Sequence, residues 1–152
     1  MNLKGEFNVP YGHKTHLKPC DPSRIKEASA ALATAELVVG DFKDTVASAG
    51  RGDVVYFDPP YTVAHSNNGF VKYNAKIFSW DDQRRLAALA RLLSERGCHV
   101  IVSNADHESI RALYEGTFTI HLLSRPSRIS ASAAHRRPVT ECVFHTLGPS
   151  TC

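Results

Sequence analysis

The chain has 152 residues, of which 43% are hydrophobic and 22% charged, and this fits one ordinary domain with an apolar core rather than a disordered chain. Its formal net charge of +3 permits a nucleic-acid partner without requiring one. The first residues are polar, and no apolar run approaches the roughly 20 residues of a membrane span. We therefore expect a cytoplasmic protein with no membrane segment.

The first part of the chain is predicted to alternate helices with short strands. Residues 1–22 are rich in Gly, Pro, Asn and Lys, which favours a loop or a short hairpin. An alanine-rich helix is predicted over 23–36, N-capped by its first serine. The run LVVGD at 37–41 predicts a short buried strand, and a short helix is expected over 42–49. A second buried strand, DVVYFD at 53–58, is stopped by two prolines.

A long polar loop and a strong helix come next. The loop covers 62–78, and the helix covers 79–97. Ser79 and Asp82 have the spacing of a capping box, with Asp in place of the usual Glu. Apolar residues recur at the helical period, and a glycine at the end marks the stop. This segment is therefore predicted to be an amphipathic helix with one face in the core.

The last part of the chain is predicted to be mainly strands. CHVIVSN at 98–104 is a third buried strand, and 106–116 is a short helix. TFTIHLL at 117–123 is a fourth strand, and a basic loop rich in Ser and Ala covers 124–138. VTECVFHTL at 139–147 is the last strand. This order predicts an α/β fold with a mainly parallel, helix-covered sheet and an antiparallel edge, because the last two strands follow one another without a helix.

Polar residues follow three of these strands, at the sheet edge where open α/β folds bind ligands. They are Gly40–Asp41–Phe42, Asp58–Pro59–Pro60–Tyr61 and Ser103–Asn104. For Ser103–Asn104, a role as turn or cap residues is favoured over a functional role. For Gly40–Asp41–Phe42, the two roles are about equally favoured. The tetrapeptide is more informative, because such a word arises by chance in about one chain of this size in a thousand.

The tetrapeptide fits the chemistry of methylating an exocyclic amine on a nucleic-acid base. The lone pair of such an amine is delocalised into the ring, so the amine is a poor nucleophile. The Asp58 carboxylate and the Pro59 carbonyl can accept its two hydrogens, and the prolines hold both acceptors still. Tyr61 offers a flat face on which an extruded base can stack.

These residues resemble motif IV of amino-methyltransferases, and the rest of the chain resembles the Dam-type DNA adenine-N6 methyltransferases. The similarity is carried in the family's order by four further segments. They are NLKGEFNVPYG (2–12), the F-x-x-Y-x-x-x-x-F loop (70–78), VIVSNAD (100–106) and SRISASAAHRRPVTECVF (127–144).

The resemblance implies a partial Rossmann-like methyltransferase fold that uses S-adenosyl-L-methionine and methylates adenine N6 in double-stranded DNA, commonly at GATC. It assigns catalysis to Asp58, Pro59 and Tyr61, and cofactor binding to Asp41, Phe42 and Asp58. It implies DNA contacts for a larger set: Asn2, Lys4, Asn8, Tyr11, Lys14, Arg128, Arg136 and Arg137. A DNA-modifying enzyme of this kind is expected to work at the nucleoid.

The chain departs from the family at its start. Family members carry an earlier portion with a Gly-rich cofactor loop, and Gly50–Arg51–Gly52 is no substitute because it precedes a strand. We therefore expect a truncated methyltransferase. Residues 1–22 are expected to be a remnant of the target-recognition region, and residues 23–152 the C-terminal part of the catalytic domain. A missing N-terminal half is expected as a further partner.

Two other interpretations stay open at this stage. One is an inactive fragment that binds DNA. The other is an RNA base methyltransferase that shares the tetrapeptide. A metal site is not expected, because the four cysteines are scattered without C-x-x-C spacing.

Overall fold

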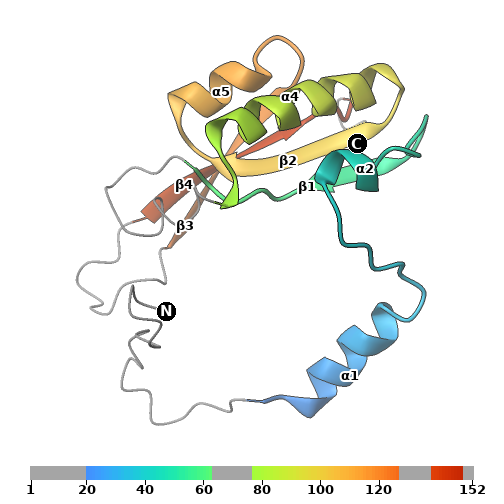
Figure 1. The fold of residues 1–152 in the computed structure, drawn as a ribbon. Coiled ribbons are helices and arrows are strands. Elements are labelled where there is room, and N and C mark those ends of the chain that lie inside the picture. The colour runs from blue at the N-terminus through green and yellow to red at the C-terminus, as the bar shows by residue number, and fades with distance from the viewer. Residues whose placement is uncertain (1–19, 63–76, 127–137, 149–152) are drawn as a thin grey trace. The chain divides into compact units, whose positions relative to one another are not determined.

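The computed structural model describes residues 20–62, 77–126 and 138–148 (Figure 1). The chain divides into two compact units, one of residues 1–38 with 128–136 and one of residues 39–127 with 137–152. In the described part of the first unit the regular element is helix α1 (Pro22–Ala31). All of the strands that the structure describes belong to the second unit.

Helix α1 begins two residues earlier than the predicted Ser23 cap would allow. Asp21 is the N-cap, since its backbone is extended and its carboxylate accepts a hydrogen bond from the Arg24 N–H at 3.5 Å. Pro22 then occupies the first helical position, where its missing N–H costs nothing. The Ser23 hydroxyl donates to the same carboxylate at 2.6 Å, so it supports the cap rather than forming it.

The second unit holds the remaining helices and the strands. In chain order they are α2 (Phe42–Thr45), β1 (Val54–Phe57), α4 (Trp80–Glu95), β2 (His99–Ala105), α5 (Glu108–Tyr114), β3 (Thr119–Pro126) and β4 (Pro138–His145).

The capping box that opens α4 is confirmed: the Asp82 N–H donates to the Ser79 hydroxyl at 3.1 Å, and the Ser79 N–H donates to the Asp82 carboxylate at 2.9 Å.

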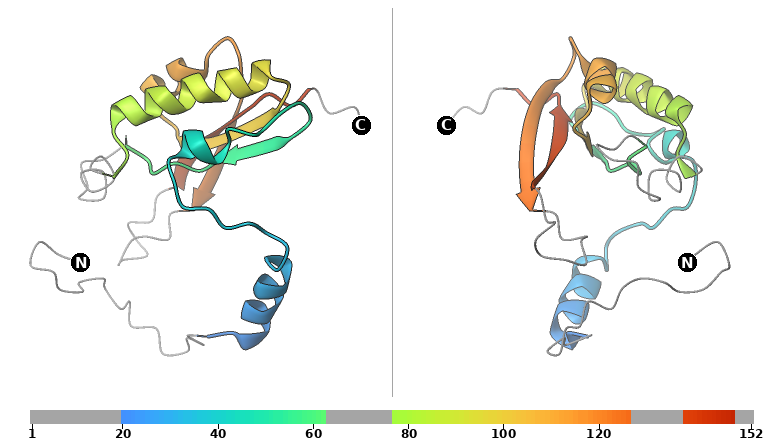
Figure 2. Two further views of the ribbon diagram at one scale, coloured as in Figure 1. Left: turned by 45° about the vertical axis from the view of Figure 1, so that its right-hand side comes forward. Right: turned by 90° about the vertical axis from the view of Figure 1, so that its left-hand side faces the viewer.

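The strands form one sheet in the order β1-β2-β4-β3. β1 runs parallel to β2, with Phe57 opposite Val102, whereas β4 runs antiparallel to both β2 and β3. The α/β class and the antiparallel edge are therefore confirmed. Helices α4 and α5 lie on the same face of the sheet (Figure 2), which makes that face the inner one.

The predicted strand at 37–41 is wrong, because these residues are not in a strand. Leu37 and Val39 are 83% and 103% exposed, although their sequence is that of a buried strand. A strand needs a neighbour that satisfies its backbone N–H and C=O groups. In the described part of the chain the sheet consists of β1, β2, β4 and β3, and residues 37–41 pair with none of them.

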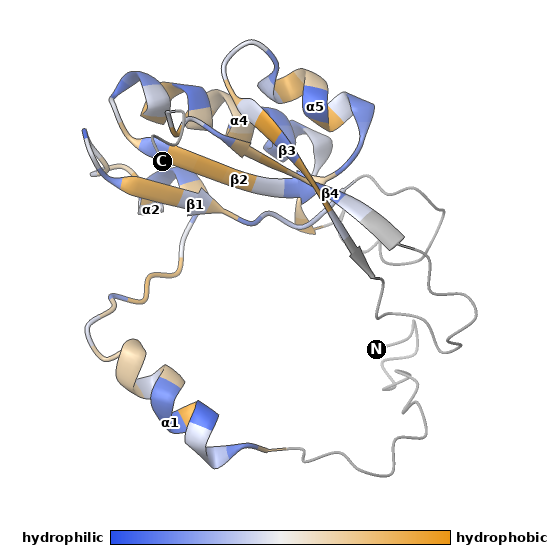
Figure 3. Cartoon of the chain, turned by 180° about the vertical axis from the view of Figure 1, so that it is seen from behind, coloured by the Kyte–Doolittle hydropathy of each residue, from blue (hydrophilic) through white to orange (hydrophobic). Residues whose placement is uncertain are grey.

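The core lies between the inner face of the sheet and the apolar face of α4. Burial alternates along β1, where Val55 and Phe57 point into the core, and β2 shows the same alternation. Figure 3 shows the apolar colouring along these two strands. From α4, the buried positions recur at the helical period and include Leu86, Ala90 and Leu93.

Tyr114 is the largest fully buried side chain of this core. Its ring stacks on Phe144 with ring centroids 4.3 Å apart, and Phe118 meets it edge-on at 5.3 Å. The hydroxyl has no hydrogen-bond partner among the described residues. Burial, which disfavours the phenolate, raises the pKa of Tyr114 well above its ordinary value of 10.

This burial predicts a specific loss of stability in alkaline solution. The folded protein holds the Tyr114 proton more tightly than the unfolded chain does, so the contribution of this group is intact below pH 10 and falls as the pH rises above it. The variant Tyr114→Phe should lose this part of the alkaline dependence and be at least as stable at pH 7, since no hydrogen bond is broken. Urea unfolding at pH 7 and above pH 10 measures both effects. An equal alkaline loss in the two proteins would show that Tyr114 ionises freely.

Candidate active site

The tetrapeptide Asp58–Pro59–Pro60–Tyr61 follows directly on the last residue of β1, at the carboxyl end of the strand. Alternation along β1 sets the directions of the side chains: Phe57 is buried in the core, whereas Tyr56 and Asp58 are exposed. Pro59 is buried and Tyr61 partly buried. The prolines end β1 because they have no N–H for the sheet, and they fix the backbone that follows.

The Asp58 carboxylate is held by a chain of two hydroxyl groups. Ser103 donates to Asp58 Oδ1 at 2.7 Å, and the Tyr56 hydroxyl donates to Ser103 Oγ at 3.1 Å. Ser103 reaches Asp58 because Phe57 and Val102 are opposite one another in the parallel pair. The structure therefore gives Ser103 a contact with the central residue of the candidate site, where the sequence favoured a turn residue.

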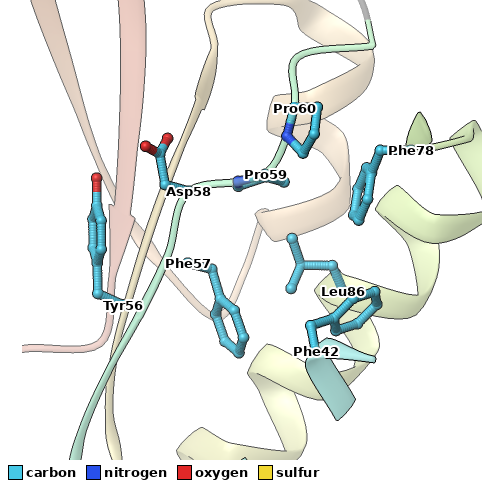
Figure 4. A pocket seen from close by; sticks show the side chains of 8 residues that line it. All are labelled: Phe42, Tyr56, Phe57, Asp58, Pro59, Pro60, Phe78 and Leu86. Atoms are coloured by element: carbon cyan, nitrogen blue, oxygen red, sulfur yellow. The ribbon is translucent and has the colours of Figure 1, made fainter. Parts of the chain in front are cut away.

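A pocket of about 220 Å³ opens beside this turn (Figure 4). Its lining combines the strand end with aromatic and aliphatic side chains from elsewhere: Phe42, Tyr56, Phe57, Asp58, Pro59, Pro60, Phe78 and Leu86. Phe42 and Phe78 lie with ring centroids 5.8 Å apart. The pocket thus brings together two of the three residues predicted to bind the cofactor, Phe42 and Asp58.

Asp41, the third of these residues, does not line the pocket. It holds the start of α2, whose first residue, Phe42, does line it. It is the N-cap of α2, where its carboxylate accepts from the Lys43 N–H at 3.0 Å. Arg85 of α4 donates to both of its carboxylate oxygens, at 3.0 and 2.8 Å. The Arg85 guanidinium also lies over the Phe42 ring, 4.9 Å from its centroid.

Hydrogen bonds from Arg85, followed by that from the Lys43 N–H, hold the pKa of Asp41 below its ordinary value. Arg85 also donates to Asp82 at 2.7 Å, so one guanidinium joins the start of α4 to the start of α2. Sequence reasoning missed Arg85, because a charged residue on a helix is usually solvated and nothing in its neighbours marks the long-range contact.

Sequence reasoning also missed Gln83, which is fully buried. Its side-chain amide donates to the Pro60 carbonyl at 3.4 Å and to the Thr62 hydroxyl at 3.2 Å. Asn104 Nδ2 in turn donates to Gln83 Oε1 at 2.9 Å. A signal was present in the sequence, since Gln83 has the helical spacing of the buried residues Leu86 and Ala90 and so had to lie in the core.

The residues predicted to bind DNA lie outside the described residues. They are Asn2, Lys4, Asn8, Tyr11, Lys14, Arg128, Arg136 and Arg137. Within the described ranges, no three His, Cys, Asp or Glu side chains gather closely enough to hold a metal ion. None of the helices described here combines the length and the hydropathy that crossing a membrane requires.

Comparison with known proteins identifies relatives along almost the whole chain. A type II methyltransferase of Lactococcus lactis subsp. cremoris is 33% identical over 150 residues, which is 97% of this chain and 52% of the relative. The retron Ec67 DNA adenine methylase of Escherichia coli is 36% identical over 93% of this chain and 47% of its own length. The DNA adenine methylase of Serratia marcescens is also 36% identical, over 92% of this chain and 52% of the relative.

The chain thus spans about half the length of the curated relatives it matches. The resemblance drawn from the sequence is confirmed by a match to the sequence profile of the D12 class N6 adenine-specific DNA methyltransferases, which covers residues 1–128. This chain belongs to the D12 class N6 adenine-specific DNA methyltransferase family.

Proposed function

We propose that this chain carries the catalytic part of an enzyme that transfers a methyl group from S-adenosyl-L-methionine to adenine N6 in double-stranded DNA, at a GATC-like site. The observation that carries the proposal is the position of Asp58–Pro59–Pro60–Tyr61, which combines a carboxylate, a rigid carbonyl and an aromatic ring at the edge of an apolar pocket. Family membership and relatives named as DNA adenine methylases support it.

In this proposal Asp58 and Pro59 activate the target amine. Ser103 holds Asp58 Oδ1, which leaves Oδ2 to accept one N–H of the amine, while the Pro59 carbonyl accepts the other. Both bonds draw the nitrogen lone pair out of the ring and aim it at the donor methyl. Asp58 does not act as a base before transfer, since the nitrogen loses its proton only after gaining the methyl. Tyr61 stacks on the extruded base.

The pocket beside the turn suits the methyl donor. S-adenosyl-L-methionine, when bound, supplies an electrophilic methyl group on a sulfonium. The aromatic pair Phe42 and Phe78 suits an adenine ring, and the Asp58 carboxylate suits a positive charge close to the reacting atoms. Asp41 supports this pocket through the cap of α2 and its ion pair with Arg85.

DNA binding is assigned to the start of the chain and to the segment that joins β3 to β4 in the sequence. We propose residues 1–22 as part of the target-recognition region and 23–152 as catalytic. Asn2, Lys4, Asn8, Tyr11 and Lys14 then touch the duplex, and Arg128, Arg136 and Arg137 meet phosphates, which supply most of the salt-dependent affinity.

The Asp58 proposal is tested by transfer of tritiated methyl groups to duplex DNA containing GATC and to RNA. Asp58→Asn keeps the size of the side chain but replaces an acceptor oxygen with a donor, so methylation of DNA should fall by roughly 100-fold or more. Asp81→Asn, which changes an exposed carboxylate on α4, is the matched control and should keep full activity. Label in RNA alone would support the RNA methyltransferase interpretation, and no label with any substrate would support the inactive fragment.

The donor pocket is tested by Arg85→Gln. Loss of the guanidinium frees Asp41 and uncovers one face of Phe42, so S-adenosyl-L-methionine should bind about fivefold more weakly in a calorimetric titration. The pKa of Asp41 should rise toward its ordinary value, which ¹³C NMR of the carboxyl carbon measures directly. Arg84→Gln, which removes a cation paired with Asp81, is the control. Unchanged Asp41 titration in Arg85→Gln would contradict the role of the ion pair.

We also propose that two surfaces are covered by polypeptide that corresponds to the rest of the relatives' length. They are the edge of β1 that pairs with no described strand, and the outer face of the sheet. A strand with the sequence VVYF is typical of a sheet interior with both faces covered, yet Val54 and Tyr56 are 66% and 59% exposed. The relatives hold about as much polypeptide again as this chain matches. An added strand also relieves the exposed edge, which otherwise favours aggregation.

The part of the Serratia marcescens methylase that this chain does not match is the probe for this edge. Mixed with the chain, it should form a one-to-one complex in size-exclusion chromatography with light scattering. Val54→Lys, on the outer face, should weaken the complex at least tenfold, by analogy with charge placed on strands that must pair. Leu92→Lys, an exposed change on α4, should leave it intact. A stable homodimer that excludes the probe would assign the edge to a second copy of the chain.

A further inference from the structure

Gln83 is a polar side chain in a place where the fold calls for an apolar one. It is fully buried on the core face of α4, in line with Leu86 and Ala90. Burying an amide without partners destabilises a protein, so a buried amide normally makes hydrogen bonds. Both the nitrogen and the oxygen of the Gln83 side-chain amide make hydrogen bonds. The identity of the partners indicates the role of Gln83.

The orientation of every amide in this network is determined by its neighbours. The Ala105 N–H donates to Asn104 Oδ1 at 2.8 Å, which leaves Asn104 Nδ2 to donate to Gln83 Oε1 at 2.9 Å. Gln83 Nε2 must then face the opposite way, toward the Pro60 carbonyl and the Thr62 hydroxyl. The network thus begins at the rigid backbone of β2 and ends on the turn after β1.

The two acceptors of Gln83 lie on either side of Tyr61. Pro59 and Pro60 have fixed φ angles, but the proline restraint ends after them. The Pro60 carbonyl and the Thr62 side chain are held by the same nitrogen, at 3.4 and 3.2 Å. A tether at both neighbours of Tyr61 fixes the backbone from which its ring projects.

We propose that Gln83 is a positioning residue, which acts through Pro60 and Thr62 to hold Tyr61 and the end of the tetrapeptide in the geometry for methyl transfer. This inference rests on the proposed function, in which Tyr61 stacks on the extruded base. Gln83 itself touches neither substrate nor donor in this assignment.

The chemistry of glutamine fits this position better than that of other side chains. The task needs two N–H donors on one atom and an acceptor beside them, which only a carboxamide provides. Glutamate keeps the acceptor for Asn104 but loses both donors. Methionine matches the length and the unbranched shape of glutamine and has neither strong donor nor acceptor, so it isolates the hydrogen bonds from the packing.

The first arm of the test uses the chain alone and no substrate. NMR order parameters of the backbone amides should be near 0.85 at Tyr61 and Thr62 in the wild type and fall below about 0.6 in Gln83→Met. Those of Val55 and Val100, in the adjoining strands, should not change. Arg84→Met, the neighbouring exposed position on α4, is the matched control and should leave all four amides rigid. Unchanged order parameters in Gln83→Met would overturn the proposal whatever the activity.

The second arm measures methyl transfer to DNA. Gln83→Met should lower kcat by roughly 10- to 100-fold, the effect of a displaced catalytic group, with the KM for S-adenosyl-L-methionine within about twofold. Thr62→Val removes one of the two tethers and should give a smaller loss in the same direction, whereas Thr62→Ser keeps the hydroxyl and should restore the wild-type kcat. If the loss of kcat came only from a less stable core, restoring the hydroxyl with Thr62→Ser would not restore kcat.

The outcomes separate this inference from the proposed function. Lower order parameters with an unchanged kcat would overturn the positioning role while leaving DNA methylation intact. Full DNA methylation by Asp58→Asn would overturn the proposed function, and the order parameters would still decide whether Gln83 holds the backbone around Tyr61.

Discussion

The parallel register between β1 and β2 determines the rest of the site. With Phe57 opposite Val102, Asp58, which directly follows β1, lies beside Ser103 of β2. Asn104, one residue further along β2, turns into the core and reaches Gln83. A shift of one residue would send every side chain of β1 to the opposite face and remove the carboxylate from its hydroxyl donor. Strand pairing, more than any single contact, therefore places the tetrapeptide.

Two polar systems extend from this strand pair to different sides of the turn. On the outer side, hydroxyl groups of Tyr56 and Ser103 orient the carboxylate of Asp58. On the inner side, Asn104 and Gln83 hold the backbone after the prolines. The pocket opens between the turn and the α2–α4 contact, where Arg85 holds Asp41 and covers Phe42. The site is thus assembled from short local motifs that long-range polar contacts bring into one arrangement.

Much of this was predictable from local sequence rules. Capping at Ser79, the proline stop after β1 and the apolar runs of β1 and β2 depend on neighbouring residues, and the structure agrees with them. One local prediction failed, since Asp21 and not Ser23 caps α1, but the others that failed depend on distant partners. Residues 37–41 have the sequence of a strand, but strand formation requires a neighbour that the sequence pattern alone does not supply. The roles of Ser103, Gln83 and Arg85 depend on contacts across 45, 23 and 44 positions in sequence, which no local pattern encodes.

The most direct measurement of the proposed chemistry is mass spectrometry of nucleosides from a bacterial host that lacks adenine methylation and expresses this chain together with the unmatched part of the Serratia marcescens methylase. The structure and the family assignment predict N6-methyladenine in the DNA, and none when Asp58 is replaced by asparagine. Methylated cytosine in the DNA, or a methylated base confined to the RNA, would contradict the assignment of the tetrapeptide to adenine N6 in DNA.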